Sequence, residues 1–126
     1  MTLSELRQIL CCDVFAGEDA LGRPVEYGCA SDLMSDVLAF SRTGALLLTG
    51  LVNVQTVQTA LVAELSAIVF VRGKKPDGPV LHLARHHGIP LLGTPYSMYE
   101  ACGILYRAGI PPTMQSLSST ARESDT

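Results

Sequence analysis

One pattern recurs four times in this chain of 126 residues: a short apolar run, a turn of small or capping residues, and a stretch with helical apolar spacing. The runs at residues 45–48 and 67–71 are continuously apolar, which is typical of strands buried on both faces. Consecutive parallel strands need crossover connections, so helices cover both faces of their sheet. The pattern therefore predicts a three-layer α/β/α fold around a mainly parallel sheet of about four to five strands.

Capping residues mark where the later helices begin and end. The predicted N-caps of the second, third and fourth helices are Asn53, Asp77 and Ser97. Ser97 and Glu100 have the spacing of a capping box, and Gly88 and Gly109 are expected to end the last two helices.

The first strand–helix unit, within "VEYGCASDLMSDVLAFS", is the weakest of the four. Either Ser31 or Asp32 fits the N-cap of its helix. The expected apolar stripe of this helix consists of Leu33, Val37, Leu38 and Phe40.

The remaining segments frame this core. A helix is expected over roughly residues 3–10, a short edge strand in "CCDVF", and a loop over residues 17–24. We expect a single domain over residues 1–110. Residues 111–126 contain few apolar and many Ser and Thr residues, which indicates a disordered C-terminal tail.

Polar residues follow all four strands of the predicted sheet. Because parallel strands end at the same edge, these turns should lie together, at the place where α/β proteins bind ligands. Cations beside helix N-termini suit a phosphate or a carboxylate, so this edge is a candidate ligand-binding site. Its candidate residues are Asp32, Thr49, Gly50, Asn53, Arg72, Lys74, Lys75, Thr94 and Ser97. The alternative is that these residues only cap helices or carry solvated charges.

The motifs of common catalytic sites are missing. After Thr49-Gly50 the chain reads "LVNVQ", without the second glycine and the lysine of a P-loop, so this turn is a corner between strand and helix. "VRGKKPDG" also lacks the glycine and hydroxyl spacing of a P-loop, and neither G-x-G-x-x-G nor G-x-S-x-G occurs. We therefore expect no catalytic residues and no cofactor.

Histidines and cysteines give no metal signature. His82 and His86 share one helical face, which supplies two ligands at most, and the four cysteines contain no C-x-x-C. We expect no metal site and four reduced thiols. An enzyme that uses Cys29 or a histidine is a further hypothesis, although no base lies at a recognisable spacing.

Charge and hydropathy restrict the partners. A net charge of −3 and a pI near 5.5 argue against nucleic acid as a partner. No apolar run reaches the roughly 18 residues of a membrane span, and "MTLSELRQIL" lacks the apolar centre of a signal peptide. We expect a cytoplasmic protein without membrane contact.

Two predicted helices lack the charged outer face of a typical surface helix. Residues 53–63 carry no charge, and residues 98–106 have apolar side chains around most of the helix. Either these helices are sandwiched inside the domain or they form an interface. In a chain of this size they can hardly all be interior, so we expect a homodimer.

Four stretches, "SDLMSDVLAF", "LLTGLVNVQTVQTA", "AIVFVRGKKP" and "GIPLLGTPYSMYEACGILYRAGI", resemble the DRTGG domain family in its small stand-alone form. The similarity extends from about Leu3 to Ile110. Thr49-Gly50 matches the Thr-Gly-Gly element of the family, with Leu51 in place of the last glycine. Asp32 matches the aspartate of the Asp-Arg element, and no arginine follows it.

This resemblance implies a regulatory role. DRTGG domains are regulatory or spacer modules in phosphotransacetylases and in CBS-containing pyrophosphatases, where they contribute to dimer contacts. Their fold is similar to the non-catalytic N-terminal domain of HPr kinase/phosphorylase. Stand-alone members occur near hydrogenase-type redox genes, which suggests a larger metabolic or redox enzyme as partner.

Two functional hypotheses follow. The first is a non-catalytic regulatory or protein-interaction module. The second is a sensor that binds a nucleotide or another anionic effector at the strand C-terminal edge.

Overall fold

The computed structural model describes residues 1–113, and every structural statement below concerns these residues. The tail expected after residue 110 lies, from residue 114 onward, outside them. The elements are α1 (Leu3–Ile9), β1 (Asp13–Ala16), the 3-10 turn η1 (Glu18–Ala20), β2 (Tyr27–Ala30), α2 (Met34–Phe40), β3 (Ala45–Thr49), α3 (Val54–Val62), β4 (Ala67–Phe70), α4 (Gly78–His87), β5 (Leu91–Gly93) and α5 (Met98–Arg107).

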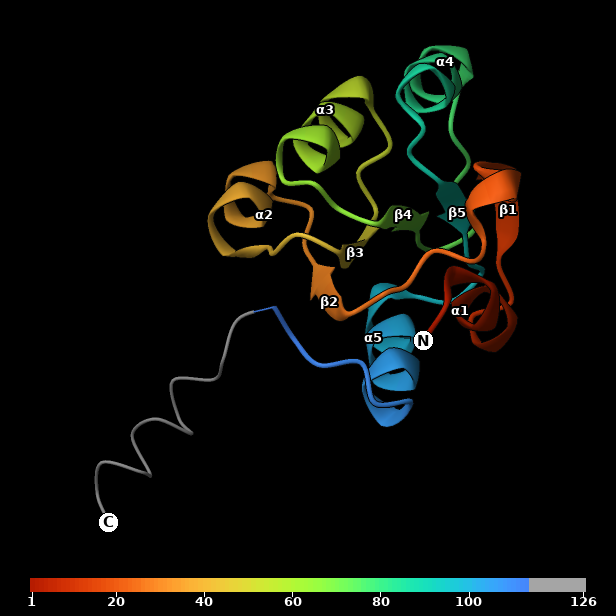
Figure 1. Ribbon diagram of the computed structural model, residues 1–126, viewed down its shortest axis with the longest axis vertical. Helices are drawn as coiled ribbons and strands as arrows, with labels where there is room; N and C mark the ends of the chain where they lie inside the picture. Colours follow the sequence, from red (N-terminus) through yellow and green to blue (C-terminus); the bar gives the residue numbers. More distant parts are fainter. Residues whose placement is uncertain (114–126) are drawn as a thin grey trace.

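The sheet has five strands in the order β1-β5-β4-β3-β2. Strands β2 to β5 are parallel, whereas β1 joins β5 antiparallel at one edge. Helices α2, α3 and α4 cover one face of the sheet, and α1 and α5 cover the other (Figure 1). The predicted three-layer α/β/α fold, with its mainly parallel sheet, is confirmed.

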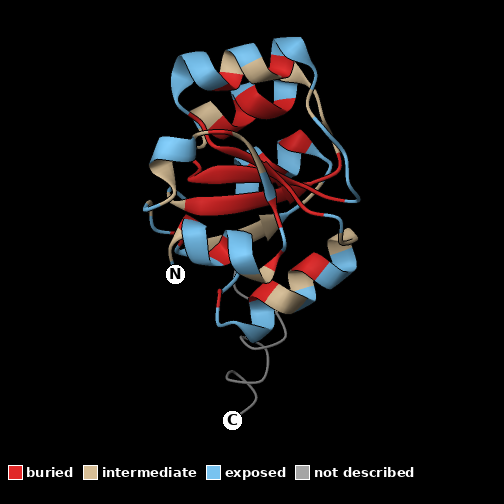
Figure 2. Cartoon of the chain, turned by 90° about the vertical axis from the view of Figure 1, so that its right-hand side faces the viewer, coloured by how far each residue is buried: buried red, intermediate tan, exposed pale blue. Residues whose placement is uncertain are grey.

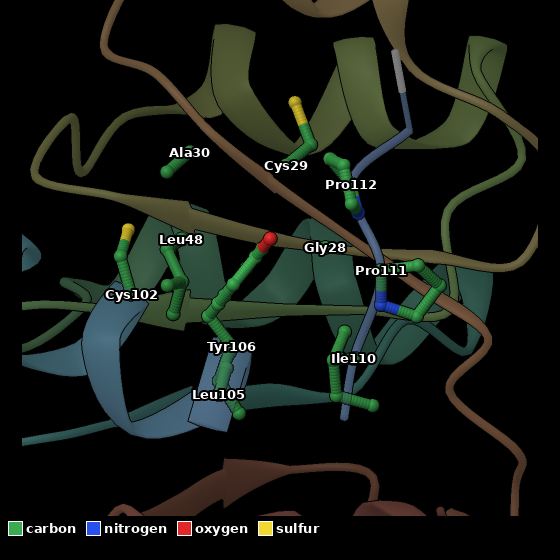
Figure 3. A pocket seen from close by; sticks show the side chains of 10 residues that line it. All are labelled: Gly28, Cys29, Ala30, Leu48, Cys102, Leu105, Tyr106, Ile110, Pro111 and Pro112. Carbon is green, nitrogen blue, oxygen red and sulfur yellow. The ribbon is translucent and has the colours of Figure 1, made fainter. Parts of the chain in front are cut away.

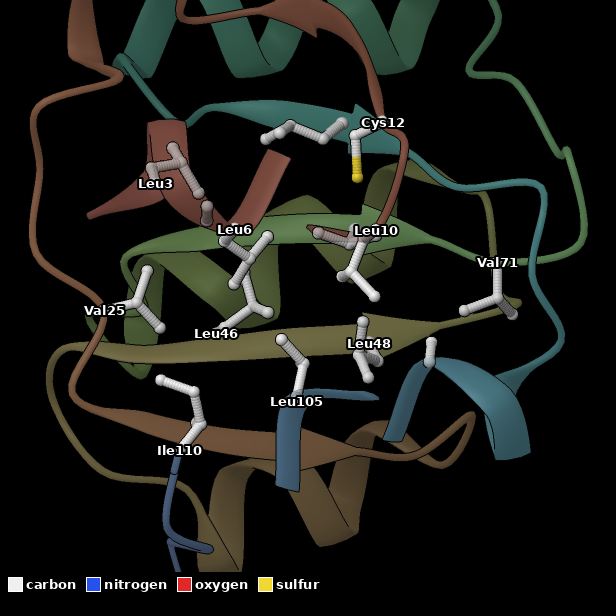
Figure 4. Packing of buried hydrophobic residues seen from close by; sticks show 14 residues of the cluster. Leu3, Leu6, Leu10, Cys12, Val25, Leu46, Leu48, Val71, Leu105 and Ile110 are labelled. Carbon is white, nitrogen blue, oxygen red and sulfur yellow. The ribbon is translucent and has the colours of Figure 1, made fainter. Parts of the chain in front are cut away.

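Each face of the sheet has its own apolar core. Leu46 and Leu48 of β3 pack with α1 and α5 (Figure 4). Leu47, between them, packs on the side of α2 to α4. The central strands are buried along their whole length (Figure 2). Complete burial of one such leucine contributes about 2 kcal/mol to folding. This explains why the strands read as unbroken apolar runs.

Several predicted helix ends are confirmed. Asn53, Asp77 and Ser97 each accept a hydrogen bond from the backbone N–H three residues further on. Gly88 and Gly109 have the positive φ angles, 71° and 96°, that end a helix. The chain also has a complete capping box that the sequence analysis missed, between Thr2 and Glu5 at the start of α1.

The prediction for α2 is wrong in two respects. Its N-cap is Leu33, which makes no side-chain cap bond, since Asp32 turns toward the neighbouring turn. Its buried residues are Met34 and Val37. Leu33, Leu38 and Phe40, expected on the apolar stripe, are exposed by 58%, 51% and 49%. With only seven residues, α2 covers the sheet with two side chains.

The uncharged helix α3 is partly interior. It packs between α2 and α4, and its buried residues are Thr56, Val57, Thr59 and Ala60. Gln55, Gln58 and Val62 are exposed. None of the helices within residues 1–113 is both long and apolar enough to cross a bilayer.

Candidate functional site

The Thr49-Gly50 turn lies beside Asp32. Strands β2 and β3 are parallel neighbours, with Ala30 opposite Leu48, so the turns that follow them meet at the same edge of the sheet. Asp32 Oδ1 accepts hydrogen bonds from the Gly50 N–H, at 2.6 Å, and from Thr49 Oγ1, at 2.9 Å. The turns that follow β2 and β3 are therefore bonded to one another.

Two cations of the next turn complete this group. Lys74 Nζ donates to the Gly50 carbonyl oxygen at 2.6 Å. A Cβ atom on residue 50 would lie 3.3 Å from Arg72 Nη2 and 3.4 Å from Asp32 Oδ2, so the absence of a side chain at Gly50 lets both groups approach. We call Asp32, Thr49, Gly50, Arg72 and Lys74 the Asp32 cluster.

Backbone bonds hold the turn that carries these cations. The Arg72 N–H donates to the Tyr96 carbonyl at 2.8 Å, and the Gly73 N–H donates to the Thr94 carbonyl at 2.9 Å. Arg72 has a φ of 60°, a left-handed conformation that is uncommon for a residue with a side chain. The turns after β4 and β5 thus support each other.

The Asp32 carboxylate is stabilised in its charged form. The Gly50 N–H has the largest effect and lowers the pKa of Asp32. Burial, the next largest effect, raises it, and the Thr49 hydroxyl and the charges of Lys74 and Arg72 lower it further, so the net shift is downward. Asp32 is therefore ionised at neutral pH. A carboxylate with a lowered pKa is a poor proton acceptor there, which does not suit a general base.

The other predicted site residues lie apart from this cluster. Asn53 and Ser97 cap α3 and α5. Thr94 is buried and donates to the Leu10 carbonyl at 2.6 Å, so its hydroxyl faces α1. Lys75 lines a hollow of about 170 Å³ beside Cys11, Asp13 and Phe15, together with Thr94 and with Lys74 of the cluster.

A second feature, beside β2, was not predicted. It is an almost wholly apolar cavity of about 170 Å³ between β2 and α5, which we call the β2 hollow (Figure 3). It is lined by Gly28, Cys29, Ala30, Leu48, Cys102, Leu105, Tyr106, Ile110, Pro111 and Pro112. The alternation of the small residues Gly28 and Ala30 along β2 is the signal that could have indicated it.

The four thiols are free, and burial raises the pKa of three of them. Burial raises the pKa of Cys12 to about 12, and it also raises the pKa of Cys29 and Cys102 in the wall of the β2 hollow. Cys11 is exposed, with its Sγ 3.7 Å from the Tyr96 hydroxyl. Raised pKa values leave little thiolate at neutral pH, which does not favour nucleophilic chemistry by Cys29.

The three histidines lie along α4, from its middle to its end. The rings of His82 and His86 stack with centroids 6.3 Å apart, and His86 meets His87 edge to face at 4.8 Å. Within residues 1–113, no group of three or more His, Cys, Asp or Glu side chains is placed to hold a metal ion.

Comparisons with known proteins give a structural match only. No protein-family model matches the sequence, and no curated protein matches it. Among solved structures, the chain is similar to the CBS and DRTGG domains of the regulatory region of Clostridium perfringens pyrophosphatase, a crystal structure in complex with the activator diadenosine tetraphosphate. The TM-score is 0.70 at 13% sequence identity.

This match covers 98% of the chain and 59% of the solved one, so the chain spans about three fifths of that structure. At such low identity the likeness shows the fold alone. The chain has a DRTGG-like α/β fold, which it shares with a regulatory rather than a catalytic region of another protein.

Proposed function

We propose that this chain is a non-catalytic regulatory or protein-interaction module. The observation that carries the proposal is the Asp32 cluster. Its carboxylate is bound by Gly50 and Thr49, and its lysine is bound by the Gly50 carbonyl. The polar groups at this edge therefore bind one another, and none of them within residues 1–113 is a nucleophile paired with a base. The regulatory region with a similar fold supports the same reading.

A homodimer is part of this proposal. Within residues 1–113, large apolar side chains are exposed on the neighbouring helices α2 and α3 and on α5. They include Leu38, Phe40, Val62, Tyr99 and Tyr106, exposed by about half or more. Such surface suits a second copy of the chain or a larger metabolic or redox enzyme. We further propose one cytoplasmic domain over residues 1–110, with neither nucleic acid nor membrane as partner.

Light scattering tests the assembly. We expect the full-length chain to have twice its mass of 13.4 kDa. Val62→Glu, at an exposed position of α3, should reduce this to the monomer mass, because it places a charge in the proposed interface. Gln8→Glu, at an exposed position of α1 on the other face of the sheet, is the control for charge alone. A wild-type monomer would contradict the dimer, and phosphoryl transfer by the purified chain would contradict the non-catalytic role.

A second candidate function is supported by the same edge. Arg72 and Lys74 converge on the Gly50 turn rather than pointing away from it, which favours a sensor of a nucleotide or another anionic ligand. The solved structure of similar fold contains a nucleotide activator, which adds support to this candidate. At a hundred times the dissociation constant, a ligand stabilises the folded chain by about 2.7 kcal/mol. Nucleotides that leave the melting temperature unchanged would remove this candidate.

A further inference from the structure

The inference concerns Asp32, and it rests on the proposed anion site. We propose that the Asp32 carboxylate is a tethered competitor, which occupies the position of an external anion and must leave it before a ligand binds. The anion that displaces it is a diphosphate or polyphosphate group. Asp32 thus sets the affinity and the charge selectivity of the site.

The groups that hold Asp32 are those that would hold a phosphate oxygen. A backbone N–H and a hydroxyl converge on the single atom Oδ1, at 2.6 and 2.9 Å. The other carboxylate oxygen, Oδ2, and Arg72 Nη2 both lie within 3.4 Å of the position of a Cβ on residue 50. Anions commonly bind to such a set of donors and a guanidinium.

The donors are fixed, whereas the acceptor is exposed. Thr49 is fully buried at the end of β3, and Gly50 is held through its carbonyl by Lys74. Asp32, by contrast, is an exposed residue in the loop between β2 and α2. Withdrawal of its side chain would therefore leave a preformed site behind.

Helix α2 does not depend on the Asp32 carboxylate. Its N-cap is Leu33, whose backbone N–H donates to Ser31 Oγ at 3.0 Å. The carboxylate that the sequence offers as a cap is used across the sheet edge instead. Its displacement by a ligand would therefore leave the helix start intact.

Charge explains why a polyphosphate is the expected ligand. With Asp32 in place, its single negative charge offsets one of the two cations, Arg72 and Lys74. A monovalent anion gains little by replacing one carboxylate with another charge of the same size. A group with two or more negative charges interacts with both cations and competes effectively.

The test is a titration of the isotope-labelled full chain with pyrophosphate at constant ionic strength, followed by the amide resonance of Gly50. The dissociation constant for pyrophosphate should be at least tenfold lower for Asp32→Ala than for wild type. Asp36→Ala, which removes the same charge from an exposed position four residues away, should stay within twofold of wild type. Lys74→Met in the Asp32→Ala background should abolish the gain.

Asp32→Asn is a second variant, for the case that Asp32→Ala disturbs the turn. It keeps the shape of the side chain and removes its charge, so it should also bind pyrophosphate more tightly than wild type. Equal dissociation constants for wild type and both Asp32 variants would overturn the competitor role and leave the anion site standing. No binding by any variant would overturn both the competitor role and the anion site.

Discussion

The Asp32 cluster lies at the carboxyl ends of the parallel strands, and the β2 hollow lies beside the edge strand β2. The two regions differ in what fills them. In the cluster, polar groups from three successive turns bond to one another at 2.6 to 2.9 Å. In the hollow, small residues of an edge strand leave about 170 Å³ between β2 and α5. One region is closed by specific partners, and the other is open because side chains are short.

The comparison shows how one fold separates two kinds of surface. Buried donors must be satisfied, and at this edge a side chain of the chain itself, Asp32, accepts from Thr49 and Gly50. An apolar hollow leaves no donor or acceptor unpaired, so it needs no internal occupant. Substitutions in the two regions should therefore change the free energy of unfolding by different amounts.

The largest effect is expected at the floor of the hollow. Leu48 is 2% exposed and belongs to both the apolar core and the hollow wall. Leu48→Ala should lower the free energy of unfolding by about 3 kcal/mol, because it removes core contacts and enlarges a space already present. Urea denaturation measures this. Leu46→Ala, in the same core but outside the hollow, is the control and should lower the free energy of unfolding by no more than Leu48→Ala does. A loss below 1 kcal/mol at Leu48 would contradict the packing.

Thr49 should come next, since its hydroxyl has two bonds. It donates to Asp32 Oδ1 at 2.9 Å and accepts from the Leu51 N–H at 3.1 Å. Thr49→Val keeps the shape and loses both bonds, so we expect a loss of about 2 kcal/mol in urea denaturation. Thr43→Val, at an exposed position, should change stability by less than about 0.5 kcal/mol. Equal effects at the two positions would show that the cluster is not a bonded unit.

Asp32 should contribute less than Thr49 to the free energy of unfolding, and its contribution should depend on pH. Asp32→Ala should cost about 1 kcal/mol at pH 7, because the carboxylate is largely exposed although its partners are fixed. The folded state lowers the pKa of Asp32, so its contribution is complete above the unfolded pKa of about 3.9. It is lost as the pH falls through the lower, folded value.

The difference in stability between wild type and Asp32→Ala should therefore be constant from pH 7 to about pH 5, and should shrink below about pH 4. Urea titrations at several pH values measure it, with Asp36→Ala as the control. A difference that grows as the pH falls would mean that Asp32 is destabilised in the folded state.

The smallest effect is expected for filling the hollow. Ala30 is exposed on the edge strand β2, and its side chain lines the cavity. Ala30→Val should raise stability by about 0.5 kcal/mol, because a β-branched residue favours the strand and covers apolar surface. Thermal unfolding measures the change. A destabilisation above 1 kcal/mol would mean that the space is already occupied.

The sequence predicts the fold better than the site because each follows from different signals. Continuous apolar strands and capping residues such as Asn53 and Asp77 act locally, so their pattern is readable along the chain. The partner of Asp32 lies 17 and 18 residues away, and only the parallel pairing of β2 and β3 brings it there. From the sequence, Asp32 therefore fits a helix cap as well as a ligand-binding edge.

The β2 hollow was missed for a related reason. Its walls come from β2, β3, α5 and residues 110–112, and a cavity is a space between such elements rather than a property of any one of them. The exposed Leu38 and Phe40 of α2 show a further limit, since helical spacing does not reveal how many positions a short helix buries. Of the nine residues that the sequence suggests for the strand C-terminal edge, five meet in the Asp32 cluster.

The most direct test of the Asp32 cluster is the pH dependence of the Gly50 amide resonance in the ligand-free, full-length chain. The carboxylate bonded to this N–H should shift the resonance as it is protonated, with a midpoint below the ordinary aspartate value of about 3.9. Asp32→Asn should remove the transition. A Gly50 resonance that does not titrate, or that titrates at or above 3.9 in the wild type, would contradict the account.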